Sequence, residues 1–459
     1  MQAPAHADRV ASSPLASPLT RAAELTATYG LAAFVLTLPL EFTAAIFHQQ
    51  LSRLVLLALG IAYGYLLIVG RRKLSLPRHL SLALLAAFIA VSLVSWAATR
   101  APHSLNSVLD IALYPIVALL VINIPLDERD HRRAWNALLV SGAAVAVLGF
   151  VLYVEHLHIW SPNVAVTHRL NITFADPNIT ARFLTLATCA AVLMFSSRKS
   201  PPWLALAAAI SCAVVLPMTW SRSGLALFVV CTVIATIFAF DRRRAVAIAG
   251  IALLAFAIST TVNPDTRQRA SEAMATAATA VTGQPMGTQV TPIPGQEGVA
   301  LEDNRVYLVA AGLKMFADHP LVGVGFGGYQ NAMLTAYRSF LPQGYTDSVS
   351  HTSLVTVLAE QGVLGALLLI LFLLALARET WLSRRREKTD TDSWPFWSAL
   401  ASMLVIPILF FSQFEARFLQ EPYLWLALGM FYSARLLAGR EAARNTAAIG
   451  PAARTAEAA

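Results

Sequence analysis

Residues 79–97 read HLSLALLAAFIAVSLVSWA, a run without an acidic residue, a lysine or an arginine. A helix of this length rises through nearly the whole hydrocarbon core of a bilayer, which is roughly 30 Å thick. Because lipid offers no hydrogen-bond partner, the backbone of such a run must bond within itself, and a helix does so. Runs of this kind recur and predict about twelve spanning helices, at residues 29–47, 51–70, 79–97, 106–124, 134–154, 178–196, 202–219, 224–240, 245–262, 352–377, 394–413 and 421–437.

Composition supports the same class. Hydrophobic residues make up 57% of the 459 residues and charged residues only 13%, about half the charge of a typical soluble domain. The three cysteines lie inside apolar runs, which excludes a disulfide framework and a cysteine metal site. We therefore predict an all-α integral membrane protein.

Basic residues indicate the orientation. Excess lysine and arginine in short connections marks the cytoplasmic side. On this basis both termini are predicted to be cytoplasmic, and the net charge of +8 is a topology signal and not a nucleic-acid-binding surface. The connections concerned, which alternate along the chain, contain Arg71-Arg72-Lys73, Arg129 with Arg132 and Arg133, Arg198-Lys199, Arg242-Arg243-Arg244, and Arg384-Arg385-Arg386 with Lys388.

One connection is much longer than the others, and long loops in compact proteins tend to carry function. Within it, apolar residues at helical spacing (Val306, Val309, Leu313 and Phe316) predict an amphipathic helix on the membrane surface or over the bundle, with Asp303 as N-cap and His319-Pro320 as its end. Gly323–Gly328 is predicted to be a flexible turn. The predicted organisation is a cytoplasmic N-terminal tail at 1–28, helices 1–9 at 29–262, an extracytoplasmic loop at 263–350, helices 10–12 at 351–437, and a disordered cytoplasmic tail at 438–459.

Three arginines are predicted at the extracytoplasmic ends of helices or in the long loop. Arg222 lies in Thr219-Trp-Ser-Arg-Ser-Gly224, a tight connection, and either contacts lipid headgroups or holds a phosphate with its planar guanidinium. Arg305, in the loop helix, has the same two interpretations. Arg182 lies one to two turns into the sixth span, where it either pairs with Asp176 near the helix start or contacts a ligand.

His351 begins the tenth span, also on the extracytoplasmic side. The positive end of the helix dipole favours a neutral imidazole there, and a neutral imidazole can act as a general base. Packing or helix capping at the interface is the alternative role.

Four segments on the predicted extracytoplasmic side follow one another along the chain: Phe174-Ala-Asp-Pro-Asn178, Thr219-Trp-Ser-Arg222, Asp318-His-Pro-Leu-Val-Gly-Val-Gly325, and His351-Thr352 followed by Gly362 and Gly365. In this order they resemble the signature of the O-antigen ligase and polymerase superfamily. The resemblance covers roughly residues 170–370. One departure is Thr352, because the family more often has Asn, Ser or Gln after the histidine.

The resemblance implies a glycosyltransferase-C-like membrane enzyme in the bacterial inner membrane, with its active site on the periplasmic side. It implies an O-antigen ligase of lipopolysaccharide biosynthesis, which transfers a glycan from undecaprenyl pyrophosphate to a sugar hydroxyl of lipid A–core. Arg222, Arg305 and Arg182 would then bind the donor pyrophosphate, and His351 would activate the acceptor hydroxyl, giving inversion. No cofactor or metal is expected, and the one Asp-x-Asp pair, Asp390-Thr-Asp392, falls in a predicted cytoplasmic loop. Besides membrane lipids, donor and acceptor are the expected partners.

Two alternatives stay open. The first is a related enzyme with a different acceptor, either an O-antigen polymerase or a protein O-oligosaccharyltransferase. The second is a membrane solute transporter, although transporters commonly show internal repeats and ionisable residues near mid-bilayer. No obvious repeat is present, and Glu41, Asp110 and Glu360 are the acids predicted within spans.

Overall fold

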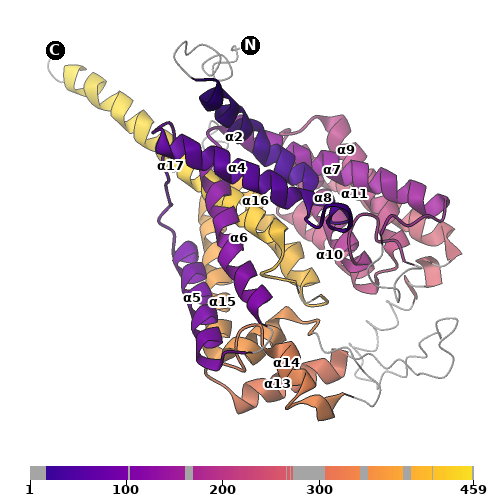
Figure 1. Cartoon of the computed structure of the whole chain (residues 1–459). Coiled ribbons are helices and arrows are strands. Elements are labelled where there is room, and N and C mark those ends of the chain that lie inside the picture. Colours follow the sequence, from indigo (N-terminus) through magenta and orange to yellow (C-terminus); the bar gives the residue numbers. More distant parts are fainter. Residues whose placement is uncertain are drawn as a thin grey trace.

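The protein is an all-α integral membrane protein (Figure 1). The computed structural model describes residues 17–101, 104–160, 169–264, 266–268, 270–271, 305–341, 350–385, 394–415 and 417–456. The pair Asp390-Thr-Asp392 and the N-cap expected at Asp303 lie outside these ranges. The described elements are α2 (Pro18–Thr37), α3 (Thr43–Phe47), α4 (Leu51–Ile68), α5 (Leu80–Thr99), α6 (Leu105–Asn123), α7 (Glu128–Val154), α8 (Pro177–Ser196), α9 (Pro202–Val215), η2 (Leu216–Thr219), α10 (Arg222–Ile237), α11 (Arg242–Val262), α13 (Arg305–Asp318), α14 (Tyr329–Leu334), η3 (Arg338–Phe340), α15 (Ser353–Arg385), α16 (Trp394–Phe411) and α17 (Pro422–Ala456).

Within the described part of the chain, nine helices are long and apolar enough to cross a membrane. They are α4, α5, α6, α7, α8, α9 continued by η2, α11, α15 and α16. Three further helices, α2, α10 and α17, lie where the sequence predicts the remaining spans, and α10 is a shorter apolar helix. The multi-pass character is therefore confirmed, and the number twelve stays a prediction.

Two predicted boundaries at the ends of the chain are wrong. The first helix begins at Pro18 and not at residue 29, because Ser17 caps it by accepting a hydrogen bond from the Thr20 amide and proline suits the first helical position. At the other end, α17 continues through residue 456, so the segment predicted as a disordered tail is helical over most of its length. Alanine-rich sequence favours this continuation.

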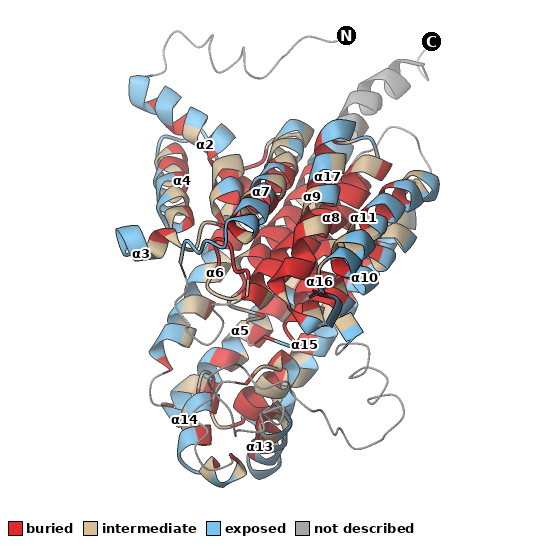
Figure 2. Ribbon diagram, turned by 90° about the vertical axis from the view of Figure 1, so that its right-hand side faces the viewer, coloured by how far each residue is buried: buried red, intermediate tan, exposed pale blue. Residues whose placement is uncertain are grey.

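Successive long helices run in alternate directions, so the connections fall into two groups. We call the end of the bundle that carries α13 and α14 the loop end, and the opposite end, where α2 begins and α17 extends beyond the bundle, the terminal end (Figures 1 and 2). The turns at Arg71, Arg198 and Arg242 lie at the terminal end, whereas the residues predicted to form the site lie toward the loop end.

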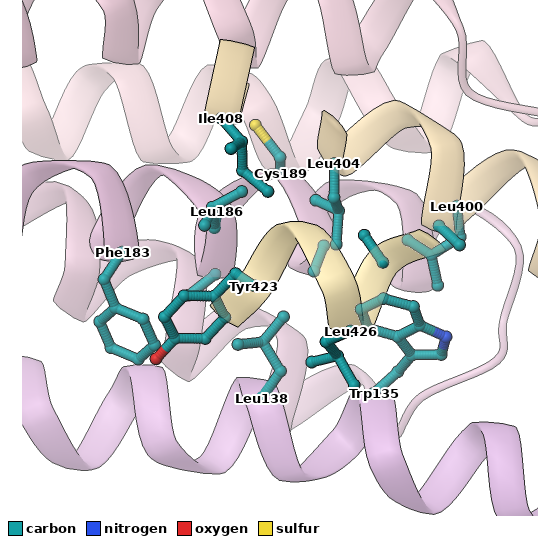
Figure 3. Packing of buried hydrophobic residues seen from close by; sticks show 14 of the residues in the cluster. Trp135, Leu138, Phe183, Leu186, Cys189, Leu400, Leu404, Ile408, Tyr423 and Leu426 are labelled. Atoms are coloured by element: carbon teal, nitrogen blue, oxygen red, sulfur yellow. The ribbon is translucent and has the colours of Figure 1, made fainter. Parts of the chain in front are cut away.

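Helix α8 forms the centre of the bundle. In its apolar stretch 94% of residues are buried, compared with 22% in α11 and 28% in α4 at the periphery. It packs against α7, α9, α10 and α16, and small residues permit close approach: a Cβ on Gly142 of α7 would lie 2.6 Å from the Ala187 Cβ. Figure 3 shows side chains of α7, α8, α16 and α17 in one cluster, with Phe183 of α8 beside Tyr423 of α17. This packing gives α8 a fixed position from which to hold polar groups at its loop end.

Helix α15 is kinked at Gly362, where φ is 64° and ψ is −159°. The kink frees backbone groups, and residues 320–325 bind them. The Val324 amide donates to the Ala359 carbonyl at 2.8 Å, and the Val363 amide donates to the Pro320 carbonyl at 2.8 Å. Gly323 must be glycine, because its φ is +69° and a Cβ would lie 2.3 Å from the Glu360 carbonyl carbon. The segment predicted to be a flexible turn is therefore held in one conformation. We call these backbone hydrogen bonds between residues 320–325 and the kink of α15 the backbone lock.

The predicted loop helix is present as α13, but its buried face differs from the predicted one. Leu308, Ala311 and Met315 are buried against the α14 region and the first turns of α15, whereas Val306 and Leu313 are exposed. The sequence pattern identified the outer apolar stripe because both sides of this helix carry apolar residues. The position of α13 over α15 supports the "over the bundle" alternative.

Candidate active site

The segment that carries His351 is fixed to the end of α16. The Ser353 amide and hydroxyl both donate to the Ser412 carbonyl, at 3.1 and 2.9 Å, and the Leu354 amide donates to Gln413 Oε1 at 3.3 Å. The Thr352 hydroxyl, at the position that departs from the family pattern, donates to the Gln413 carbonyl at 3.4 Å. These contacts hold the chain in place directly after the histidine.

His351 itself is half-buried and directly precedes the first turn of α15, at the loop end. Its neighbours Ser350 and Ser353 are buried. The predicted location at the start of a helix is therefore confirmed, and the catalytic role of His351 stays a prediction. A histidine placed in this way can receive a proton from a group that enters from the loop end.

Arg182 was predicted to contact a ligand or to pair with Asp176, and the structure places it between two other carboxylates. Its side chain is 1% exposed, and its guanidinium lies between two carboxylates of the α16–α17 connection. Nη1 donates to Glu415 Oε2 at 2.8 Å, Nη2 donates to Glu421 Oε2, and Nη1 also reaches the Arg417 carbonyl at 3.4 Å. Pairing with Asp176, the alternative considered from the sequence, is not the arrangement seen either. Arg182 is a buried clasp that ties the α16–α17 connection to α8.

The two carboxyl groups of this clasp are strongly affected by their surroundings. Burial raises the pKa of the Glu415 carboxyl to about 7, against the attraction of Arg182, and burial also raises the pKa of Glu421. Glu415 Oε1 has no hydrogen-bond partner within the described ranges. Because the raised pKa values reduce the negative charge of the two carboxyl groups, the single guanidinium of Arg182 neutralises most of it. Its two terminal nitrogens are used by these carboxyl groups and are not open to a phosphate.

The turn that carries Arg222 is held by residues of the Phe174–Asn178 segment. Ser221 caps α10 by accepting a hydrogen bond from the Gly224 amide at 3.0 Å, and its hydroxyl donates to Asn178 Oδ1 at 2.6 Å. The same Asn178 oxygen accepts from Arg169 Nη2 at 3.1 Å. Two segments that resemble the family signature, distant in sequence, thus support each other directly.

Arg222 is exposed at the first position of α10. Among the residues that the structure describes, its guanidinium makes no hydrogen bond and no ion pair. A guanidinium at the loop end with unused donors can bind an anion. Arg305 begins α13, and its side chain lies outside the described part of the chain.

A cavity of about 280 Å³ lies beside the His351 segment. Its wall is formed by α6, the segment leading into α14, the first turns of α15 and the α16–α17 connection. Among the described residues, no lysine, arginine or histidine lines it. The side chains that line it are those of Ser107, Phe326, Tyr329, Gln330, Ser350, Ser353, Thr356, Val357, Glu360, Gln361, Phe418, Leu419 and Gln420, with Gly327.

Residues 206–370 match the family model described as O-antigen ligase. Over these residues the chain is similar to the O-antigen ligase family. No curated protein matches it in a sequence search. Members of this family are membrane glycosyltransferase-like enzymes, which agrees with the multi-pass bundle.

The O-antigen ligase match includes three of the four predicted site residues. Arg222, Arg305 and His351 lie within residues 206–370, and so do the kink of α15 and the backbone lock around it. Arg182 lies outside the match, as does the α16–α17 connection that it binds. The division agrees with the structure, in which Arg222 is accessible and Arg182 is enclosed.

Sequence reasoning missed most of the polar network beside the site. Glu415 and Glu421 were not considered, and Glu41, which was predicted within a span, lies in the turn after α2. There its carboxylate accepts from the Ala175 amide at 3.1 Å and pairs with Arg417 at 3.4 Å. A signal was present, because two glutamates occur in a short connection on a side that carries few basic residues.

Proposed function

We propose that this protein is an O-antigen ligase that transfers a glycan from undecaprenyl pyrophosphate to a sugar hydroxyl of lipid A–core. The observation that carries the proposal is the combination of an accessible, unengaged Arg222 with a fixed, half-buried His351 at the same end of the bundle. An arginine suits the pyrophosphate of the donor, and a histidine suits the hydroxyl of the acceptor.

In the proposed reaction, the acceptor oxygen attacks the anomeric carbon while the bond from that carbon to the pyrophosphate oxygen breaks. His351 takes the proton of the acceptor hydroxyl, and undecaprenyl pyrophosphate leaves as an anion. Arg222 and Arg305 stabilise the negative charge that grows on the leaving oxygen, which is electrostatic catalysis without a metal. One displacement inverts the anomeric configuration.

Arg182 takes a different role in this proposal from the one expected. Its guanidinium is already matched by Glu415 and Glu421, so it positions the α16–α17 connection, and that connection in turn holds the His351 segment through Ser412 and Gln413. Arg182 is therefore a positioning residue and not a donor ligand.

The proposed orientation places the loop end in the periplasm and the terminal end in the cytoplasm, with the protein in the bacterial inner membrane. The basic turns at Arg71-Arg72-Lys73 and Arg242-Arg243-Arg244 lie at the terminal end, as the charge rule requires. Residues 263–350, of which the structure describes 305–341 and a few others, then form the periplasmic loop.

The test is a transfer assay with purified protein, carrier-linked glycan and two acceptors offered separately, lipid A–core and a second carrier-linked repeat. We expect product on lipid A–core, with inverted configuration and a rate unchanged by EDTA. His351→Ala should lower the rate about 10²–10⁴-fold and leave donor binding intact. His156→Ala, at an exposed histidine of the loop end, is the control.

Other results contradict parts of the proposal. Product only on the carrier-linked repeat would identify a polymerase. A folded His351→Ala variant with the wild-type rate would remove His351 from the reaction, and retained configuration would require an enzyme nucleophile.

A further inference from the structure

The cavity beside the His351 segment has the chemistry of a carbohydrate site. We propose that it binds the acceptor sugar whose hydroxyl is activated, and that Gln330, Gln420 and Ser107 are the groups that recognise this sugar. The proposal rests on the proposed function, and it places the acceptor sugar in the cavity beside the His351 segment.

The lining suits a neutral saccharide and not a phosphate. The described residues of the lining include hydroxyl and carboxamide side chains and the aromatic residues Phe326, Tyr329 and Phe418, and none of them is cationic. The one carboxylate in the described part of the lining, Glu360, is occupied, because its two oxygens accept hydrogen bonds from the Gly327 and Tyr329 amides at 2.9 and 3.0 Å. A pyrophosphate would find no positive charge here, whereas sugar hydroxyls would find neutral hydrogen-bonding partners.

The polar groups of the lining fall into two sets. One set is used by the fold: Gln361 accepts from Ser92 at 3.0 Å, and the hydroxyls of Ser353 and Thr356 donate to backbone carbonyls. The other set is Ser107 on α6, Gln330 on α14 and Gln420 in the α16–α17 connection. Within the described ranges no side-chain hydrogen bond is made by any of these three residues.

Three elements distant in sequence thus bring unused hydrogen-bonding groups to one cavity. A carboxamide offers two donors and an acceptor, and a hydroxyl offers one donor and an acceptor, which matches the alternating needs of vicinal sugar hydroxyls. The volume of about 280 Å³ lies near the lower end for small-molecule sites and suits a terminal sugar better than a whole glycan.

The location favours the acceptor over the donor sugar. Ser350 and Ser353, on either side of His351 in the sequence, line the cavity, so a sugar bound there lies beside the segment that carries the proposed base. Arg222, the proposed phosphate ligand, begins α10, which packs against α8, α11 and α16 and contributes no residue to the cavity. An in-line displacement needs this separation, because the base serves the attacking oxygen and the arginine serves the leaving group.

The experiment uses Gln330→Leu, Gln420→Leu and the double variant, in which shape is roughly kept and hydrogen bonding is lost. Gln50→Leu, at a half-buried glutamine of the loop end that does not line the cavity, is the matched control. Binding of lipid A–core and of undecaprenyl-pyrophosphate-linked glycan is measured separately in detergent, together with steady-state transfer and thermal unfolding.

We expect each cavity variant to raise the Kd and the KM for lipid A–core about 2- to 10-fold, with the double variant additive. Donor Kd and unfolding temperature should stay at the wild-type values. Unchanged acceptor Kd and KM in the double variant would overturn the proposal. A weaker donor Kd with an unchanged acceptor Kd would overturn it too, because the cavity would then hold the donor sugar.

Failure of the proposed function gives a different pattern. If the wild-type protein transfers glycan only to a second carrier-linked repeat, the ligase assignment fails, and the cavity proposal then requires the same variants to raise the KM for that repeat. If the wild type transfers nothing yet binds lipid A–core, a loss of that binding in the double variant supports the site without the reaction.

Discussion

Arg182 and Arg222 lie at the loop ends of neighbouring helices, yet their guanidinium groups have opposite surroundings. Arg182 is enclosed by Glu415 and Glu421, whereas Arg222 is exposed and makes no ion pair among the described residues. A buried arginine without partners would be very costly, so its two glutamates are required by its position. The exposed arginine has no such requirement, because water can solvate its guanidinium.

Substitution of Arg222 tests its role as a phosphate ligand. Arg222→Ala should lower kcat about 10²–10³-fold, the range seen when one donor to a developing anion is lost. Arg222→Lys should be intermediate, because lysine keeps the charge and loses the planar fork. The measurements are transfer kinetics and donor affinity, with Arg53→Ala at an exposed arginine of the loop end as control. Normal donor affinity in both Arg222 variants would show that this arginine only anchors the helix at the membrane surface.

The clasp around Arg182 predicts a pH dependence of stability. Burial raises the pKa of Glu415 from 4.5 to about 7, with Asp176 and Glu421 acting in the same direction and Arg182 and Arg417 opposing them. The folded state therefore binds more protons than the unfolded state between these values, so the contribution of Glu415 to stability is present below about pH 4.5 and is lost as pH rises through 7. Glu415→Gln mimics the neutral form and should remove this loss.

The measurement is the unfolding temperature of both proteins in detergent from pH 5 to pH 8. The stability of Glu415→Gln relative to wild type should increase with pH across this window. Glu155→Gln, at an exposed glutamate of the loop end, should show no such trend. A difference between Glu415→Gln and wild type that is constant with pH would mean that the Glu415 carboxyl is ionised throughout.

At the scale of elements, the positions of helices follow from the sequence more readily than their contacts do. The apolar run at 79–97 corresponds to α5 at Leu80–Thr99, because the thickness of the bilayer sets the length of the apolar run and of the helix that it forms. The start of α2 at Pro18 was missed, because the signal there is a cap and not an apolar run. The buried face of α13 was missed, because it packs on α14 and α15 and lipid exposure does not distinguish its two apolar sides.

The same limit explains which site residues could be predicted. Arg222 and His351 follow from local signals, namely a charged residue in a tight turn and a histidine at a helix start. The partners of Arg182 lie more than two hundred positions away in the chain, so only the fold brings Glu415 and Glu421 to it. The cavity is likewise lined by residues of α6, α14 and the α16–α17 connection, and no local sequence pattern in any one of these elements predicts it.

The backbone lock between residues 320–325 and the kink of α15 predicts a strict requirement for glycine. Gly323→Ala should destabilise the protein by at least about 1–2 kcal/mol from its positive φ alone, and by more because the added Cβ meets Glu360. Gly64→Ala in α4 is the control: a Cβ there meets nothing within 4 Å, so it should be neutral or slightly stabilising. Thermal unfolding and transfer rates are the measurements.

Gly323→Ala should also lower transfer, because the lock anchors the segment that follows α13, the helix that begins at Arg305. Wild-type stability and activity in this variant would show that the lock can open without consequence. The motif would then have a purpose other than positioning the loop helix.

For the whole molecule, polarity along the bundle axis connects fold and function. α8 is buried along its length and positions two polar clusters at its loop end, the Asn178 turn and the Arg182 clasp. At the terminal end, by contrast, the short connections between helices carry basic residues. A glycan donor presented in the periplasm can reach these clusters only if the loop end faces that compartment.

Labelling of single cysteines tests this orientation directly. The native residues Cys189, Cys212 and Cys231 are buried, so background reaction with a maleimide should be low. A membrane-impermeant maleimide should label Thr335→Cys, exposed at the loop end, in cells whose outer membrane has been opened. It should label Arg198→Cys, exposed in a terminal-end turn, only after the inner membrane is also permeabilised.

Reversed labelling would have consequences beyond topology. His351 and Arg222 would then face the cytoplasm, where nucleotide-activated sugars are available and a carrier-linked donor is not needed. The charge rule would also fail for this chain, because its basic turns would lie outside. Labelling as expected would place the accessible arginine, the histidine and the saccharide cavity on the side where two lipid-linked substrates can meet, which is the condition that a ligase requires.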